Sequence, residues 1–428
     1  MSRESAAEAA VLSPRRRFQV LAYCGGLLLL VGLAAPYAGL LGVPLLFFLK
    51  NRLHLSASQL ALFNLLAGVP LYLSFLFGFA RDRWSPFGAG DRGHLIVFGL
   101  ITAAIYAVIA FVTPGYAPLL VGLLVVTCSI LFVASAANGL VSSIGQRRLM
   151  AGQASTAFNV ANSVPVLAAF LGGLLSERLE GQAALDAART LFLVAAGLMA
   201  AVAALGLVGP RWLFAEAAPR PGEHGPAFSD IARLARHWPI YPALLICALW
   251  DFGPALGTAM QYHLINDMGA TDTEVGAFYA LFFGANLPTM LLYGWLCQRV
   301  RLSRLLLIGT LLAVLQMIPL LFVHTPSAAM AAAVVMGLMG GLASAAYVDL
   351  AIRSCPAGLQ ATVMMLVVTV YWISVRFGDV WGTYLYEHGG YVTTIWVSTG
   401  VYALILPLLL AVPRRLTATA DGEAQPAS

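Results

Sequence analysis

Twelve apolar stretches of about twenty residues or more follow one another along almost the whole chain. They cover residues 18–49, 57–80, 94–113, 117–144, 154–176, 187–210, 239–265, 274–298, 304–324, 327–352, 361–386 and 391–412. A helix of about 20 residues crosses the hydrocarbon layer of a bilayer. The runs are continuously apolar instead of alternating, which excludes a membrane β-barrel. We therefore expect an all-α membrane protein with twelve transmembrane helices in the lipid bilayer.

Composition and charge agree with this class. Hydrophobic residues make up 60% and charged residues 10% of the 428 residues, and the mean hydropathy is +0.84. Soluble domains carry roughly 25% charged residues, so lipid surrounds most of this surface. The net charge of +5 follows from membrane topology, and we expect no nucleic-acid partner.

The basic residues are distributed unevenly between the gaps that separate the apolar stretches. Gaps after odd-numbered stretches hold Lys50, Arg52, Arg178 and Arg189, whereas the other gaps and both tails hold most of the arginines. By the positive-inside rule, both termini are cytoplasmic. The first apolar stretch is too long for a signal peptide. Arginine outnumbers lysine 23 to 1, which is typical of GC-rich bacterial genomes, so we expect a multi-pass protein of the bacterial inner membrane.

No sequence pattern indicates catalysis, a metal or a cofactor. The five cysteines have no paired spacing, which argues against disulfides and metal sites. They are Cys24, Cys128, Cys247, Cys297 and Cys355. No Walker-type glycine loop is present, which disfavours ATP-driven transport. No nucleophile–base pair lies in the predicted helices, so a membrane enzyme is disfavoured.

The chain divides near its middle at residues 211–238, its longest polar stretch. We expect an N-terminal six-helix bundle over 18–210 and a C-terminal six-helix bundle over 239–413. Residues 211–238 form a cytoplasmic linker with a short amphipathic helix. The cytoplasmic tails are 1–17 and 414–428.

Weak repeats relate the two halves. Arg147 recurs 206 residues later as Arg353, and Gly172 recurs as Gly378. The repeat also relates Ala151-Gly152 to Ala357-Gly358, and Gly78-x3-Asp82-Arg83 to Gly294-x3-Gln298-Arg299. Such repeats indicate duplication, and they place a transporter's substrate site at the membrane midplane between the halves.

Three ionisable residues lie near mid-membrane depth, where a charge costs several kcal/mol. Arg376 and Asp379 share a helix face at i,i+3 spacing, and Asp251 lies at similar depth in 239–265. One interpretation makes Arg376 and Asp379 a structural ion pair. The other makes all three a site for substrate and proton. Asp251 has no charge partner nearby and Pro254 follows it, so Asp251 is the better proton carrier.

Uncharged polar and aromatic residues extend the candidate site. In the first half, substrate-binding candidates are Tyr37, Asn138, Asn159 and Asn162. Amides in membrane bundles also bond neighbouring helices, which is the alternative role. The aromatic residues Trp250, Tyr371, Trp372 and Trp381 can stack on a planar ring or serve only in packing. A planar aromatic or anionic small molecule suits this set.

Two clusters are candidate conformational gates. Asp82 can neutralise the positive N-terminus of the eleventh helix around 359–362, and Gly78 lets the backbones approach. The alternative is that Asp82 and Arg83 are only a solvated topology signal. Asp349 and Arg353 fall at i,i+4, which allows either a cytoplasmic gate or an ordinary surface pair.

The segment Gly78-Phe79-Ala80-Arg81-Asp82-Arg83 resembles the loop after the second helix of the major facilitator superfamily. Within it, the chain resembles the folate–biopterin transporter family and its bacterial relatives. The matching segments are Phe47–Lys50, Leu55–Leu60, Ser85–Gly88, Leu292–Gly294 and Cys355–Val363, with Pro254. The family's lysine–proline pair late in the second helix is absent, and Leu73-Ser74-Phe75 stands there instead. Branches that handle pigments or cell-wall fragments therefore stay open.

This resemblance implies the major facilitator fold of two pseudo-symmetric six-helix bundles. It also implies a monomeric secondary active transporter that moves a small organic solute by alternating access with a proton as coupling ion. The alternative is a membrane-embedded assembly or accessory factor that retains the fold without transport.

Overall fold

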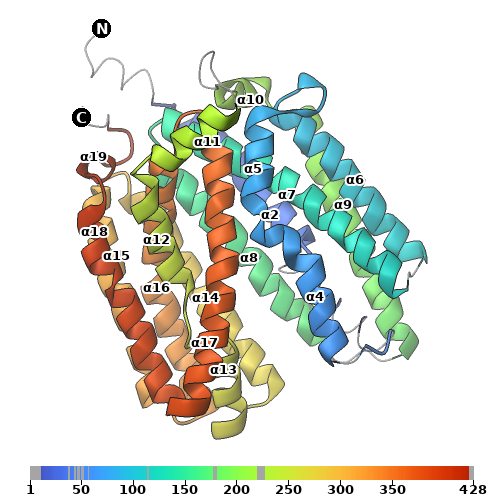
Figure 1. The fold of residues 1–428 in the computed structure, drawn as a ribbon, viewed down its shortest axis with the longest axis vertical. Coiled ribbons are helices and arrows are strands. Elements are labelled where there is room, and N and C mark those ends of the chain that lie inside the picture. Colours follow the sequence, from blue (N-terminus) through green and yellow to red (C-terminus); the bar gives the residue numbers. More distant parts are fainter. Residues whose placement is uncertain are drawn as a thin grey trace.

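The computed structural model describes residues 11–36, 39–42, 45, 49, 53–55, 57–112, 115–176, 181–218 and 227–423. Every regular element among them is a helix. Two groups of helices lie side by side, with the first half of the chain coloured blue to green and the second half yellow to red (Figure 1).

The described part of the first half contains seven main helices. They are α2 (Pro14–Ala34), α4 (Ala57–Tyr72), α5 (Ser74–Arg83), α6 (Asp91–Val112), α7 (Tyr116–Arg147), α8 (Ala151–Ser176) and α9 (Gly181–Val208). A 3-10 turn, η2 (Pro86–Gly88), precedes α6. α5 continues α4 after a bend at Leu73, because Pro70 inside α4 cannot donate a backbone hydrogen bond.

Two short helices, α10 (Arg211–Ala217) and α11 (Ala227–Arg236), connect the halves. The second half contains α12 (Ile240–Asp251), α13 (Thr258–Tyr262), η3 (His263–Asp267), α14 (Asp272–Leu296), α15 (Leu302–Leu315), η4 (Ile318–Phe322), α16 (Pro326–Ser354), α17 (Gln360–Ala403), α18 (Ile405–Ala411) and α19 (Arg414–Thr417). Nine helices among the described residues are long and apolar enough to cross a membrane.

The structure corrects one predicted helix. The stretch 239–265 is not one helix, because the backbone leaves the helical path between α12 and α13. The label α17 covers two helices that meet at a non-helical Gly390, so the stretches 361–386 and 391–412 are separate helices, as predicted. Gly390 has φ 73°, a left-handed conformation that glycine adopts without steric cost.

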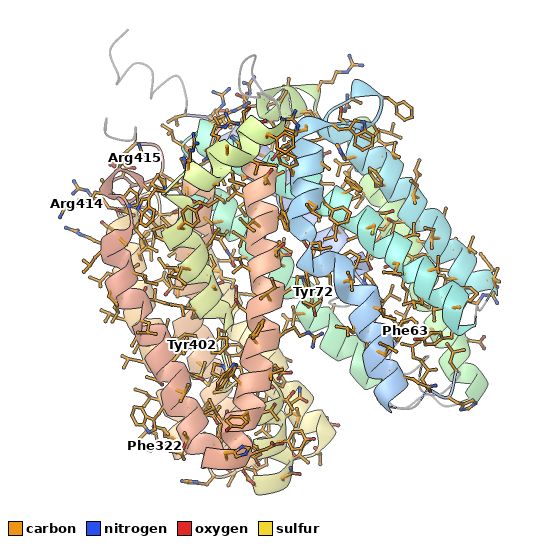
Figure 2. The ribbon with its side chains drawn as sticks, viewed as in Figure 1. Phe63, Tyr72, Phe322, Tyr402, Arg414 and Arg415 are labelled. Atoms are coloured by element: carbon orange, nitrogen blue, oxygen red, sulfur yellow. The ribbon has the colours of Figure 1, made fainter. Side chains whose placement is uncertain are left out.

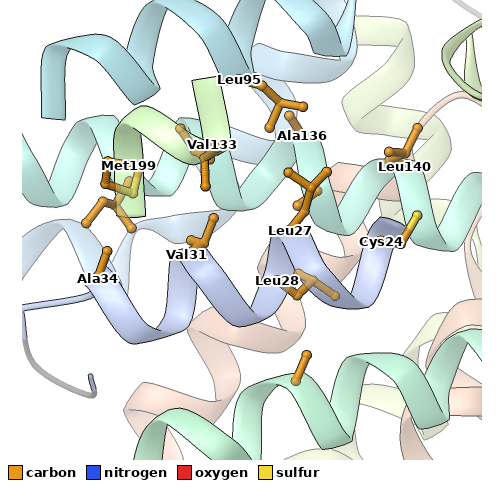
Figure 3. Packing of buried hydrophobic residues seen from close by; sticks show 14 of the residues in the cluster. Cys24, Leu27, Leu28, Val31, Ala34, Leu95, Val133, Ala136, Leu140 and Met199 are labelled. Atoms are coloured by element: carbon orange, nitrogen blue, oxygen red, sulfur yellow. The ribbon is translucent and has the colours of Figure 1, made fainter. Parts of the chain in front are cut away.

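Buried apolar residues hold the helices of the first half together. Leu27 and Val31 of α2 pack towards Val133 and Ala136 of α7 (Figure 3). The outer surface carries large apolar residues instead: Phe322, labelled in Figure 2, is 74% exposed. A bilayer covers such side chains at no hydration cost.

The two ends of the molecule differ. α10, α11 and α19 lie together at one end, the top of Figure 1, which we call the linker end. Arg414 and Arg415 lie there as well (Figure 2). α13 and η3 mark the opposite or far end. α5 lies beside α17 at the linker end, whereas α4 and α13 lie apart towards the far end (Figure 1).

Candidate functional site

The seventh predicted helix is interrupted beside its charged residue. α12 ends at Asp251, the backbone is non-helical from Phe252 to Gly257, and α13 begins at Thr258. Pro254 lies within the break and has no N–H for a helical bond. Discontinuous helices build sites in transporters because their inner ends leave backbone groups free for ligands.

α17 packs directly on this break through two glycines. A Cβ on Gly382 would lie 2.0 Å from the carbonyl oxygen of Pro254, and Gly378 fits the backbone closely one turn earlier. The hydroxyl of Tyr391 donates to the carbonyl oxygen of Ala255 at 2.8 Å. The broken segment is therefore fixed to α17.

Asp379 takes part in the same attachment. Its Oδ1 accepts the backbone N–H of Thr258 at 2.6 Å, at the first residue of α13. A Cβ on Gly257 would lie 2.2 Å from that oxygen, so glycine is needed there. The carboxylate caps the start of α13 as an N-cap side chain does, and it positions the broken helix.

Arg376 is exposed and makes no hydrogen bond or ion pair with any described residue. The structural pair with Asp379, one of the two sequence interpretations, is thus not formed. Spacing of i,i+3 permits such a pair, but the Asp379 carboxylate has turned to the Thr258 N–H instead. Arginine side chains are charged in proteins, so Arg376 carries a positive charge that no described residue matches.

Helical periodicity shows which way Arg376 faces. Thr362, Thr369 and Arg376 are spaced by seven residues, so they lie along one face of α17. Thr362 contacts Asp82 of α5, and Thr369 accepts the N–H of Phe75 at 3.1 Å. Arg376 continues the face that packs on the first half, two turns beyond the last of these contacts.

Asp251 is half-buried at the C-terminal end of α12, and no described residue bonds to it. A helix C-terminus disfavours a negative charge. Tyr371 of α17 lies within electrostatic range of both Asp251 and Arg376. The two opposite charges thus border one region, between the helix break and the exposed face of α17.

The aromatic candidates separate into two kinds. Trp250 packs between Tyr347 and Tyr402, with ring centroids 5.6 and 5.4 Å apart, so it belongs to the core of the second half. Tyr371 and Trp381 are 42% and 52% exposed on α17, which leaves their rings available for a ligand.

The candidate amides of the first half mostly join the two halves. The Asn159 Oδ1 accepts the Ser344 hydroxyl of α16 at 2.9 Å, and the Asn138 amide contacts Met365 of α17 at 3.4 Å. The Asn162 amide bonds within its own helix. Tyr37 lies outside the described residues.

Asp82 contacts the N-terminus of α17, which is the contact expected for the first candidate gate. Its Oδ2 accepts both the N–H and the hydroxyl of Thr362, at 2.8 and 2.6 Å, in the first turn of α17. Arg81 bridges Asp82 and Asp91. A Cβ on Gly78 would lie 2.5 Å from the Ala361 carbonyl oxygen, so the backbones of the two halves touch here. The neighbouring Arg83 pairs with Asp230 of α11.

The second gate is buried. Arg353 donates to Asp349 at 2.8 Å, and the Tyr293 hydroxyl donates to the other carboxylate oxygen at 2.6 Å. Arg353 also pairs with Asp421 at 2.9 Å. Asp421 lies in the predicted C-terminal tail and is not among the candidate residues. Its neighbours are threonine, alanine and glycine, which are typical of a solvated terminus, so the sequence gives no signal for this contact.

Two protein-family models match the chain. The Major Facilitator Superfamily model matches residues 162–378 and 242–427. The first match alone covers half of the chain. The chain belongs to the Major Facilitator Superfamily. It is therefore a membrane transporter by family, with the all-α fold expected from its apolar stretches. The BT1 family model also matches residues 37–244.

Individual relatives agree with this membership. A curated folate-biopterin transporter from Synechocystis sp. is 25% identical over 356 residues, which are 78% of this chain and 69% of that protein. Among solved structures, the superfamily transporter FucP in the outward conformation superposes with a TM-score of 0.69 at 15% identity, covering 92% of this chain and 98% of FucP. The proton:xylose symporter XylE gives 0.66 at 13% identity, covering 95% and 98%. These structural likenesses show the superfamily fold.

Proposed function

We propose that this protein is a secondary active transporter that moves a small organic anion by alternating access and couples it to protons. The unpaired Arg376 carries the proposal. An arginine inside a membrane bundle is costly unless something compensates its charge, and none of the described residues pairs with it. A substrate carboxylate or other anionic group completes this site.

The substrate class follows from the charge and from the relatives. The relative from Synechocystis sp. is described as a folate-biopterin transporter. A pterin or folate combines a planar ring with polar or anionic groups, and the anionic groups of this class suit Arg376. Tyr371 and Trp381 lie five residues before and after Arg376, about 140° around the helix, so their exposed rings face away from the charge.

Asp251 is the proposed proton carrier. It lies in a half-buried position at a helix C-terminus without a hydrogen-bond partner among the described residues. The neutral acid suits that environment better than the carboxylate does. Proton uptake on one side of the membrane and release on the other would drive the cycle.

The linker end is the proposed cytoplasmic end, because the arginine-rich gaps and α19 lie there. The contacts of Asp82 and Asn159 bring the halves together towards this end. We therefore assign the structure to a state closed towards the cytoplasm.

A ligand screen by thermal shift tests the proposal. Purified protein is heated with pterins, folates, aromatic acids, sugars or muropeptides, because a ligand of the native state stabilises by RT ln(1 + [L]/Kd). We expect pterins or folates to raise the melting temperature of the wild type and not that of Arg376→Ala. Arg304→Ala, on the exposed surface of α15, is the matched control and keeps the shift.

Proteoliposomes then separate binding from transport. The stabilising ligand should exchange across the membrane and accumulate when the pH gradient is imposed. A ligand that binds without any exchange would contradict transport and favour an accessory role. Equal shifts for the wild type and Arg376→Ala would remove Arg376 from the site.

A further inference from the structure

The segment after the last helix folds back to the interface between the halves. Asp421 accepts the backbone N–H groups of Gly152 at 3.1 Å and Gln153 at 3.0 Å. These are the second and third residues of α8, whose N–H groups have no partner within the helix. Met150 precedes α8, and its thioether is a weak acceptor. The helix is thus capped by an acid from 268 residues further along the chain.

The same segment is bound to the second half. The N–H of Asp421 donates to the Cys297 carbonyl oxygen at 2.8 Å. Arg353 donates to Asp421 at 2.9 Å and to the Thr419 carbonyl oxygen at 3.0 Å. The side chains of Asp421 and Arg353 are only 2% and 6% exposed. α8 and α16 therefore cannot separate here without breaking buried charge-assisted bonds.

This arrangement mirrors the gate formed by Asp82. In the first half, Arg81 holds Asp82 and Asp91, and Asp82 caps α17 of the second half. In the second half, Arg353 holds Asp421 and Asp349, and Asp421 caps α8 of the first half. Each cluster contains one arginine between two acids, although the internal repeat relates Arg353 to Arg147 and not to Arg81.

The internal repeat explains why the tail is needed. Asp82 corresponds to Gln298 after α14, which is not an acid. Gln298 is exposed and donates to the carbonyl oxygen of Gly294 in its own helix. The duplicated gate thus lacks its acid in the second half, and Asp421 takes that place.

We propose that residues 418–423, here called the tail lock, close the linker end and must be released in each transport cycle before the halves separate there. The proposal rests on the alternating-access function proposed above. The lock completes a pair of reciprocal helix caps, one from each half, so loss of Asp421 frees only one of the two.

The groups that face Asp421 come from three elements. Asp349 and Arg353 belong to α16, Tyr293 and Cys297 to the end of α14, and α8 contributes only main-chain N–H groups. Within the segment itself, Glu423 accepts the N–H of Ala420 and is exposed. Glu423 is therefore a matched control, since it is an acid of the same segment that does not touch α8.

Limited proteolysis of the purified protein tests the lock without any substrate. Trypsin can cut after the exposed Arg414 and Arg415, next to the lock, once α19 loosens. We expect Asp421→Ala to raise this cleavage rate about fivefold or more, the population change that loss of one helix cap produces. Glu423→Gln should cleave at the wild-type rate. Intact mass spectrometry identifies the product.

A distance measurement reports whether the halves also separate. Spin labels at Phe87→Cys and Gln298→Cys, exposed residues of opposite halves, are read by pulsed EPR in a Cys128→Ser background. Asp421→Ala should add a longer-distance population, and Asp421→Asn, which keeps one acceptor oxygen, a smaller one. If Asp421→Ala does not fold, Asp421→Asn alone decides.

Wild-type cleavage and unchanged distances in the variants would overturn the lock. Neither readout depends on a ligand. Failure of the lock therefore leaves the proposed substrate untouched, and failure of the ligand screen leaves these measurements valid.

Discussion

Gly382→Ala tests whether α17 holds the broken seventh helix. The added Cβ would lie 2.0 Å from the Pro254 carbonyl oxygen and 2.8 Å from its carbonyl carbon, and both atoms belong to backbone. No rotamer change relieves such an overlap. The segment must therefore move away from α17 by more than an ångström, which strains the bonds to Ala255 and Thr258.

Overpacking of this kind costs about 1–3 kcal/mol. With a shift of ~2–4 °C per kcal/mol for domains of this size, we expect an apparent melting temperature lower by several degrees in detergent. Ligand stabilisation through Arg376 should weaken as well, because Gly382, which packs on the break, and Arg376 lie on the same helix.

Gly400→Ala is the matched control. It makes the same change in the helix that follows Gly390, but no atom lies within 4 Å of its added Cβ. Alanine is favoured over glycine in helices by roughly 0.5–1 kcal/mol, so this variant should melt at or above the wild-type temperature. Equal melting of Gly382→Ala and Gly400→Ala would refute the close packing of α17 on the break.

Further predictions concern the charged groups. Arg376→Ala should abolish transport and leave the melting temperature unchanged. Asp379→Asn should lower the melting temperature, because it weakens the cap of α13. Near-normal uptake by the double variant Arg376→Ala, Asp379→Ala would contradict the proposed site. Asp251→Asn should allow substrate exchange but no uphill accumulation driven by a pH gradient, and uphill transport at the wild-type rate would exclude Asp251.

Local spacing predicted some contacts because few other geometries were possible. Gly78 and Asp82 lie one turn apart, so a glycine that admits the eleventh helix also brings the carboxylate to its first turn. Asp349 and Arg353 lie at i,i+4 in one helix, so the helix itself brings the two side chains together. The positions of the apolar stretches predicted the fold for the same reason, since bilayer thickness fixes the helix length.

Other contacts depend on tertiary structure that spacing does not encode. Arg376 and Asp379 share a face, yet Asp379 bonds to a backbone N–H that exists only because the seventh helix breaks. Pro254 follows Asp251 in the sequence, but its position does not show that the helix ends at Asp251 and begins again at Thr258. Asp421 reaches α8 across the whole fold, and a tail sequence gives no hint of its partner.

One face of α17 links the gate to the proposed site. Thr362, which Asp82 caps, and Arg376 are fourteen residues apart, about 21 Å along a single helix, with Thr369 halfway between them against α5. A helix that tilts about Thr369 towards the first half at Arg376 must move away from it at Thr362. A ligand shifts such an equilibrium only by its difference in affinity between the two states. An anion bound to Arg376 alone therefore leaves the gate closed, whereas an anion that also contacts the first half favours the tilt and opens it.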